Sequence, residues 1–194
     1  MQNLPTTLVL ASHNKGKIKN LQELLMPFGI TLKSALDLEL PEVVEDRDTF
    51  TGNATKKALS AVEATGLPAL ADDSGLCVDA LGGGPGVFTA RYGDYNRLLD
   101  ELVETPEGYR DAHFICVLAL ALPGQKEVKT FKGRISGRIH TEASGTGGFG
   151  YDPVFIPTGH DKTFAQLPAS VKNTISHRAR ALKALLKYLA SLQS

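Results

Sequence analysis

Cysteine is scarce in this sequence, which contains only Cys77 and Cys116. Two cysteines are too few for a disulfide framework or a zinc cluster, so we expect both to be small, buried, apolar residues without a redox role. The sequence also lacks any apolar run near the roughly 20 residues of a membrane-spanning helix. Residues 1–7 lack a basic segment followed by an apolar core and a cleavage site. We therefore expect a soluble, cytoplasmic protein.

Net charge is absent as well, because 21 basic and 21 acidic side chains cancel. This balance argues against a broad surface for nucleic acid. The charges are unevenly distributed, since residues 37–48 hold six acidic side chains and one arginine, whereas residues 162–194 hold no acidic side chain. Such segments are commonly solvated faces, but a cationic wall beside an acidic cluster also suits an anion held together with a metal. The charges alone leave both interpretations open.

No repeat, low-complexity segment or linker divides the sequence, so residues 1–194 are expected to form one domain. Apolar periodicity predicts helices over residues 18–28, 51–65 and 174–192 and strands over residues 7–11, 69–71, 112–122, 128–131, 134–139 and 154–156. Phe28 and Leu59 are expected on the apolar faces of the first two helices, and the second should end at Gly66. These elements indicate an α/β fold with a mixed sheet.

Two adjacent carboxylates, Asp72 and Asp73, follow an apolar run and precede Ser74 and Gly75. We expect them at the carboxyl edge of a short buried strand, where α/β sheets usually place their ligands. Successive strand side chains point to opposite faces, so only one of the two carboxylates can face a given pocket. The alternative is an ordinary turn, because Asp, Ser and Gly are common turn residues.

A small, polar and basic segment lies between the first strand and the first helix: Ser12-His13-Asn14-Lys15-Gly16-Lys17. Its backbone N–H groups, its lysines and the helix amino end could bind a phosphate. It is not a P-loop, which would need glycine at position 11 and Ser or Thr at position 18. Asn53 and Lys57 lie one turn apart on the second helix. Lys57 could reach a phosphate, although such a lysine is more often exposed.

Glycine is concentrated at residues 82–86 and 145–153. The second segment surrounds Phe149 and Tyr151, so it could close over a flat base, stack on it and let Asp152 address its edge. A glycine-rich hairpin with core aromatics is the competing interpretation. Arg91 could clamp a phosphate or pair with a surface carboxylate.

Six motifs occur in one order along the chain, namely residues 12–17, Thr49-Phe50-x-x-Asn53-Ala54, Ala71-Asp72-Asp73-Ser74-Gly75, Gly84-Pro85-Gly86, Gly147-Gly148-Phe149-Gly150-Tyr151-Asp152 and Ser176-His177-Arg178. With them the chain resembles the inosine/xanthosine triphosphate pyrophosphatases over nearly its whole length. The resemblance implies a mixed, elongated β-sheet with flanking helices, two lobes around a central nucleotide cleft, and a homodimer. It also implies Mg²⁺-dependent hydrolysis of ITP, dITP and XTP to the nucleoside monophosphate and pyrophosphate, which removes deaminated purines from the nucleotide pool.

The resemblance also implies residue roles. Asp73 would be the catalytic carboxylate and a metal ligand, and Glu45 would be the second carboxylate at the metal. The substrate-binding residues would be Ser12, His13, Asn14, Lys15, Gly16, Lys17 and Lys57 at the phosphates, Phe149, Gly150, Tyr151, Asp152, Lys172, His177 and Arg178 at the base, and Asn53 and Ser74 elsewhere on the substrate.

Two features depart from the family pattern. His13 stands where the family usually has glycine, and the chain passes almost directly from Gly93 to a helix near Asn96, without a longer loop that relatives often carry. The first departure concerns the phosphate contacts, and the second the cleft rim or the dimer edge.

These residue types suit a specific mechanism. We hypothesise that water, activated by Asp73 directly or through the metal, attacks the α-phosphorus while lysines and Mg²⁺ offset the charge of the departing pyrophosphate. A 6-keto purine accepts a hydrogen bond where adenine carries an amino group, so donors from His177 and Arg178 would favour it.

Two other functions remain open. A Maf-like nucleotide pyrophosphatase shares an Ala-Ser strand end, but its opening usually continues with Ser-Pro-Arg-Arg, where this chain has His-Asn-Lys-Gly-Lys at residues 13–17. A nucleotide-binding regulatory module would hold its ligand without hydrolysis, which the presence of both Glu45 and Asp73 disfavours. We expect a small-molecule nucleotide partner, with neither nucleic acid nor membrane.

Overall fold

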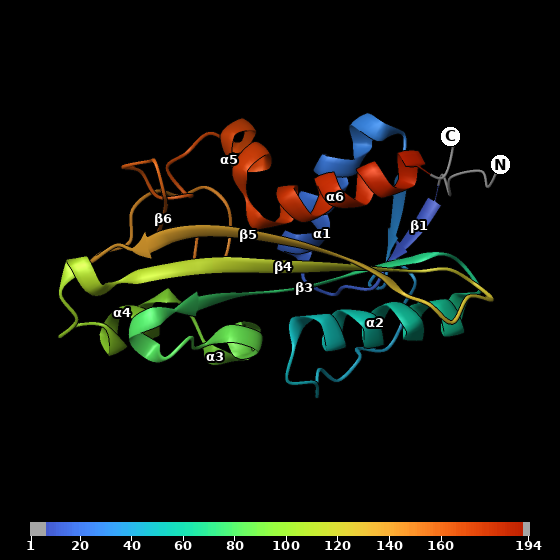
Figure 1. The fold of residues 1–194 in the computed structure, drawn as a ribbon, viewed down its shortest axis with the longest axis horizontal. Coiled ribbons are helices and arrows are strands. Elements are labelled where there is room, and N and C mark those ends of the chain that lie inside the picture. The colour runs from blue at the N-terminus through green and yellow to red at the C-terminus, as the bar shows by residue number, and fades with distance from the viewer. Residues whose placement is uncertain (1–6, 192–194) are drawn as a thin grey trace. The chain divides into compact units, whose positions relative to one another are not determined.

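The computed structural model describes residues 7–191. Its strands are β1 (Thr7–Leu10), β2 (Thr31–Ser34), β3 (Ala69–Val78), β4 (Asp111–Ala121), β5 (Lys129–Ile139) and β6 (Phe155–Pro157). They form a six-stranded sheet in the order β2-β1-β3-β4-β5-β6 (Figure 1). Strand β1 runs parallel to β2 and β3, whereas β6 runs antiparallel to β5. The sheet is therefore mixed, as the sequence predicted.

The helices are α1 (Lys15–Leu25), α2 (Phe50–Thr65), α3 (Thr89–Tyr92), α4 (Tyr95–Glu101), α5 (Ala169–Ile175) and α6 (His177–Ser191). Short 3-10 turns follow several elements: η1 (Met26–Phe28), η2 (Asp79–Leu81), η3 (Gly86–Phe88) and η4 (Glu107–Tyr109). Among residues 7–191, every helix is too short or too polar to cross a lipid bilayer.

Contacts divide the chain into two compact units. Within residues 7–191, the first unit comprises residues 7–73, 116–132 and 181–191, and the second comprises residues 74–115 and 133–180. Strands β3, β4 and β5 each contribute residues to both units. The expectation of one two-lobed domain over residues 1–194 stays a prediction.

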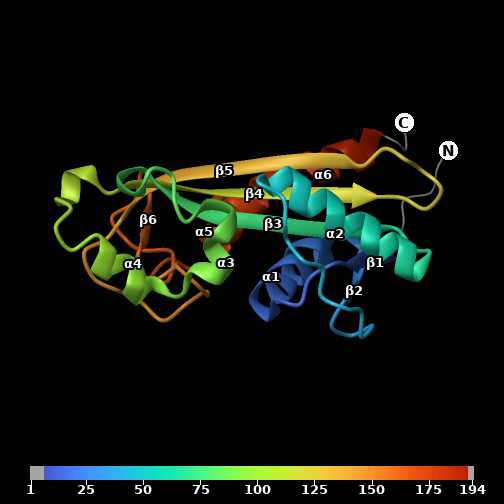
Figure 2. The same ribbon diagram turned by 90° about the horizontal axis from the view of Figure 1, so that it is seen from below.

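In the first unit, helices cover both faces of the sheet. Helices α1 and α6 lie on one face, and α2 lies on the other (Figures 1 and 2). The core under α1 and α6 consists of aliphatic side chains that include Leu8, Leu10, Leu21, Leu25, Leu70, Leu118, Leu182 and Leu185. Helix α2 instead buries Ala54, Ala58 and Ala61. Because these side chains are small, α2 can approach the sheet closely.

The ends of α1 and α2 follow from local signals. The Asn14 side chain caps α1 by accepting from the backbone N–H of Lys17, and the left-handed Gly66 ends α2 as predicted. The predictions that Phe28 and Leu59 lie on the apolar faces of their helices were wrong. Helix α1 stops at Leu25 because Pro27 follows, which leaves Phe28 in an exposed 3-10 turn. Leu59 of α2 is also exposed.

Strand β3 is longer than predicted, and Asp72 and Asp73 lie in its middle rather than at its carboxyl edge. The strand continues because Leu76, Cys77 and Val78 are buried and extend the apolar pattern beyond the carboxylates. The turn interpretation of Asp-Asp-Ser-Gly is therefore also wrong.

Two further predictions of element boundaries were wrong. Residues 128–131 and 134–139 belong to the single strand β5 instead of two strands. The helix predicted over residues 174–192 is divided into α5 and α6 by Ser176, which is extended and whose side chain accepts from the backbone N–H of Ala179. Leu192, the end of that prediction, lies outside the described residues.

The second unit has its own core. Its rings include Phe114, Phe155 and Phe164, with the Phe114 and Phe155 centroids 4.7 Å apart in an edge-to-face arrangement. Helix α4 begins after Asp94, whose side chain accepts from two backbone N–H groups, close to the helix start expected near Asn96. Gly93, with a φ of 127°, and Asp94 join α3 to α4, so two residues stand in place of the longer loop expected in relatives.

Candidate active site

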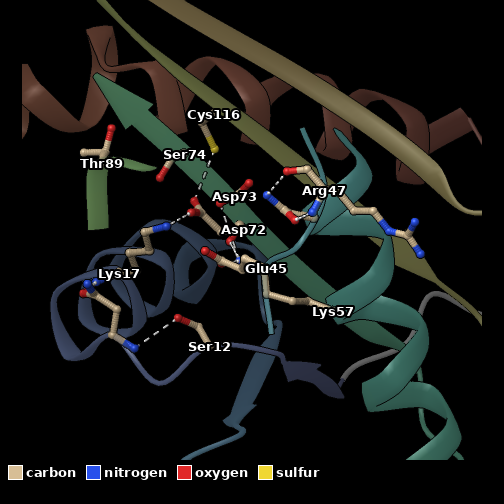
Figure 3. A network of polar contacts seen from close by, with 12 residues as sticks. Ser12, Lys17, Glu45, Arg47, Lys57, Asp72, Asp73, Ser74, Thr89 and Cys116 are labelled. Atoms are coloured by element: carbon tan, nitrogen blue, oxygen red, sulfur yellow. Dashed lines mark hydrogen bonds and ion pairs between the residues drawn. The ribbon is translucent and has the colours of Figure 1, made fainter. Parts of the chain in front are cut away.

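Asp72 and Asp73 point to opposite faces of β3 in the first unit, as strand alternation predicted (Figure 3). Asp72 lies on the α1 face, with Oδ1 2.7 Å from Lys17 Nζ, and its Oδ2 accepts from Cys116 Sγ at 3.2 Å. Asp73 lies beside α2, with Oδ1 3.7 Å from Lys57 Nζ. The two carboxylates therefore have separate partners and cannot share one role.

Asp73 is a buried carboxylate, only 3% exposed. Its Oδ2 is buried and has no hydrogen-bond partner among the described residues. Burial raises the pKa of Asp73 to about 6, against the opposing charges of Lys57 and Lys17. A buried oxygen in this state favours a cation or a proton donor as its partner.

Lys57 connects Asp73 with Glu45. Although such a lysine is usually exposed, Lys57 is buried, and its Nζ donates to Glu45 Oε1 at 2.5 Å and to the backbone carbonyl of Asp72 at 2.8 Å. The two carboxylates predicted at the metal thus contact the same ammonium group. The structure brings together the three residues Glu45, Lys57 and Asp73.

Asn53 fixes the segment that carries Glu45. Its side-chain oxygen accepts from the backbone N–H of Arg47 at 2.9 Å, and its amide nitrogen donates to the carbonyl of Arg47 at 3.1 Å. Asn53 is fully buried, so both ends of its amide hold backbone. Nearby Asp46 pairs with Lys56 at 2.9 Å. Two carboxylates of the acidic residues 37–48 therefore pair with lysines of α2. Glu45 pairs with the buried Lys57, and Asp46 pairs with the partly exposed Lys56.

The segment of residues 12–17 leads from β1 into α1. The Nε2–H of His13 donates to the carbonyl of Leu40 at 2.8 Å, and the backbone N–H of Asn14 donates to Ser12 Oγ at 3.3 Å. Lys15 is exposed, whereas the Lys17 side chain is only 14% exposed because it pairs with Asp72. His13, where the family usually has glycine, therefore anchors the segment to the chain that follows β2.

Glu45 and Asp73 are the two carboxylates of the first unit that could hold a metal. Residues 7–191 contain no group of three or more His, Cys, Asp or Glu side chains suited to a metal ion. Mg²⁺ does not need such a group, because it is commonly bound through one or two carboxylates together with substrate phosphates and water. The hard oxygen donors and the unsatisfied Oδ2 of Asp73 fit this requirement.

In the second unit, His177 and Arg178 are both buried at the start of α6. The His177 ring stacks on Phe114, with centroids 4.7 Å apart and planes 11° apart. Arg178 Nη2 donates to Ser74 Oγ at 3.1 Å. The structure thus brings Ser74, predicted as a substrate contact, to one of the predicted base-binding donors.

Lys172 and Asp152 form a buried ion pair in the same unit. The ammonium of Lys172 also lies 5.0 Å from the centroid of the Phe149 ring, and the guanidinium of Arg178 lies 5.7 Å from it. Two cations therefore approach the Phe149 ring, and one carboxylate is buried with them.

The two aromatics of the glycine-rich segment have different surroundings. Phe149 is partly exposed, whereas Tyr151 belongs to the core of the second unit. The Tyr151 hydroxyl donates to the carbonyl of Gly93 at 3.1 Å, and burial raises the pKa of Tyr151 to about 12. The stacking interpretation thus suits Phe149, and the core interpretation describes Tyr151.

Three contacts could not be anticipated from the sequence. Cys116 donates to Asp72, and Phe114 stacks on His177, from strand positions that a single sequence shows only as apolar. The third is the contact of Arg91 with Phe88, in which the guanidinium lies 5.3 Å from the centroid of the exposed ring. Both cysteines are buried, as predicted.

Comparison with known protein families shows which family has this sequence pattern. The family model described as the Ham1 family matches residues 8–188, which is nearly the whole chain. The chain belongs to the Ham1 family. This result confirms the resemblance inferred from the six ordered motifs.

Proteins of similar sequence bear the name of an enzyme. The dITP/XTP pyrophosphatase of Geobacter sulfurreducens is 50% identical over 191 residues, which cover 94% of this chain and 95% of the relative. The dITP/XTP pyrophosphatase of Zymomonas mobilis is 45% identical over 191 residues, which cover 94% and 91%, respectively.

Solved Ham1 structures share the fold. A HAM1 protein from Coxiella burnetii aligns with a TM-score of 0.84 and 39% identity over 95% of this chain and 98% of that one. The Staphylococcus aureus Ham1 protein aligns with a TM-score of 0.81 and 37% identity over the same shares. The predicted mixed sheet with flanking helices is thus the Ham1 fold.

Proposed function

We propose that this Ham1 protein hydrolyses dITP, ITP and XTP to the nucleoside monophosphate and pyrophosphate. The observation that carries the proposal is the buried carboxylate of Asp73, which has one oxygen without a hydrogen-bond partner within residues 7–191 and lies beside Lys57, the partner of Glu45. Relatives of 45% to 50% identity that bear the name dITP/XTP pyrophosphatase support the substrate class.

Asp73 acts on the attacking water in this proposal. It takes a proton as the water oxygen bonds to the α-phosphorus and the bond from the α-phosphorus to the bridging oxygen breaks, releasing pyrophosphate. Without a bound metal, burial raises the pKa of Asp73 to about 6, so the carboxylate is largely ionised near neutral pH and can accept a proton. Lys17 and Lys57 offset the negative charge of the phosphates.

Glu45 and Asp73 are the proposed ligands of Mg²⁺. The ion, when bound, supplies positive charge to the phosphate oxygens and to the departing pyrophosphate. Residues 12–17 contribute the amino end of α1 to the phosphates, where the helix dipole favours an anion.

The base is selected by buried donors of the second unit. A 6-keto group accepts hydrogen bonds from groups such as Arg178 and Lys172, whereas the amino group of adenine would leave them unpaired. Phe149, which is partly exposed, offers a ring on which the base can stack.

Pyrophosphate release tests the proposal directly. The substrates are ITP, dITP, XTP, GTP, ATP and UTP with Mg²⁺, compared by kcat/KM. A preference for ITP, dITP and XTP of at least about a hundredfold over ATP is expected. Equal rates or a uridine preference would favour a Maf-like activity, and ITP binding without hydrolysis would favour a regulatory module.

We also propose that the protein is a cytoplasmic homodimer that takes a nucleoside triphosphate and no nucleic acid. The balanced formal charge supports the last point. Sedimentation equilibrium with and without ITP tests the dimer, and a single monomeric species in both would contradict it.

A further inference from the structure

One oxygen of the Asp152 carboxylate accepts two hydrogen bonds from other groups of the protein. Asp152 Oδ2 accepts from the backbone N–H of Phe149 at 2.8 Å and from the Lys172 ammonium. Asp152 is 4% exposed and Lys172 is 9% exposed. A buried ammonium needs such a partner to offset its loss of hydration. The pair therefore fixes the position of Lys172 relative to the loop that carries Phe149.

That position matters because Lys172 lies beside the ring proposed to stack on the base. Its Nζ is 5.0 Å from the Phe149 centroid and 5.6 Å from the Phe164 centroid. The same carboxylate oxygen thus orients both an aromatic surface and a cationic donor. A base stacked on Phe149 would meet an ammonium whose direction is already set.

Gly148 is the residue that makes room for this arrangement. It has a φ of 71°, and a Cβ there would lie 2.8 Å from Asp152 Cγ, 3.0 Å from Lys172 Nζ and closer still to Asp152 Oδ2. Any side chain at this position would displace the carboxylate or the ammonium. Gly159 has a similarly left-handed φ of 84°, but a Cβ there would have nothing within 4 Å.

We infer that Asp152 is a positioning residue that acts on the base through Lys172, and that Gly148 is a determinant of base selectivity because only glycine leaves space for the Asp152–Lys172 pair. This inference rests on the proposed function. It departs from the expectation that Asp152 addresses the edge of the base itself.

The first experiment compares Gly148→Ala with Gly159→Ala, using the ratio of kcat/KM for ITP to that for ATP. Both substitutions strain a left-handed backbone, but only the first disturbs the pair. We expect Gly148→Ala to lower the ratio about tenfold or more and Gly159→Ala to leave it within about twofold. A partly unfolded preparation lowers both rates equally and does not change the ratio. Equal ratios for both variants would overturn the role of Gly148.

The second experiment is a double-mutant cycle on the same ratio with Asp152→Asn, Lys172→Met and the double variant. If Asp152 acts through Lys172, the double variant loses no more selectivity than Lys172→Met alone. If Asp152 contacts the base independently, the two losses multiply, and the positioning role is refuted. The cycle tests the positioning role of Asp152 even if Gly148→Ala does not fold.

Wild-type activity separates the two hypotheses. Absence of ITP hydrolysis by the wild type would overturn the proposed function and, with it, the inference that rests on it. Wild-type hydrolysis with unchanged ratios in Gly148→Ala and multiplying losses in the cycle would overturn the inference alone.

Discussion

Asp73 differs from an ordinary carboxylate in its surroundings. It is buried, its pKa is raised to about 6, and Oδ2 lacks a hydrogen bond among the described residues. Unsatisfied buried oxygens are uncommon in folded proteins, and they are frequent where a ligand or a reaction supplies the partner. We therefore assign the proposed chemistry to Asp73, whereas neighbouring Asp72 is satisfied by Lys17 and Cys116.

Asp73→Asn tests this assignment. Turnover of ITP with Mg²⁺ should fall by about a hundredfold or more, because the amide cannot take a proton from water. Binding of ITP, measured by calorimetry, should change much less. Asp79→Asn, at an exposed carboxylate just after β3, is the control for removal of one charge. A variant at position 73 with near wild-type kcat would remove Asp73 from the mechanism.

The sequence was most informative about charged residues that stand within otherwise apolar segments or recognisable motifs. The chemistry of Asp73 and Lys57 was inferred from motifs that a merely structural chain rarely combines. The partners were not inferable, because Cys116 and Phe114 are ordinary strand residues until the sheet brings them beside Asp72 and His177. Which apolar residue meets which polar one depends on strand register, and one sequence does not contain that information.

Lys57 lies on helix α2. The helix begins at a Thr49 cap whose Oγ1 accepts from the backbone N–H of Gly52 at 3.0 Å, and it ends at the left-handed Gly66. Both signals are local, which is why the sequence predicted this helix nearly to the residue. Strand β3 was predicted less well, because Asp and Ser have low strand propensity and only tertiary burial extends the strand through them.

Thr49→Ala should lower the free energy of unfolding by about 1 kcal/mol, because an N-cap hydrogen bond is lost at an otherwise unchanged helix. Urea denaturation followed by circular dichroism measures the difference. Thr49→Ser is the matched control, since it keeps the capping oxygen, and it should stay within about 0.5 kcal/mol of the wild type. Equal losses in both variants would show that the cap does not stabilise α2.

The stability of the whole molecule should depend on the protonation of Asp73 when no metal is bound. Its folded pKa of about 6 lies above the ordinary value of 3.8. A raised carboxylate pKa stabilises the folded state fully below 3.8, and that contribution is lost as pH rises through 6. The loss amounts to about 2–3 kcal/mol between these limits.

Urea denaturation in the presence of a chelator measures this effect as the difference between wild type and Asp73→Asn. Asparagine does not titrate, so the stability of the variant relative to the wild type should rise by about 2–3 kcal/mol from pH 4 to pH 8. Other titrating groups are common to both proteins and cancel in the difference. A difference that stays constant with pH would contradict the raised pKa.

At the scale of the chain, family membership was accessible from sequence because six motifs recur in one order. The boundaries between the two units were not, since they fall inside β3, β4, β5 and α6. Such boundaries follow from three-dimensional contacts alone.

The place of Asp73 in the interior of β3 also restricts how this gene can change over evolutionary time. Insertion or deletion of a single codon before residue 72 within the strand would exchange the faces of Asp72 and Asp73, presenting the wrong carboxylate to Lys57. Length variation should therefore be excluded from β3 across Ham1 genes and confined to connections such as the one at Gly93. We expect the protein to tolerate a reading-frame-preserving indel in its loops and to lose the proposed activity when the indel falls in β3.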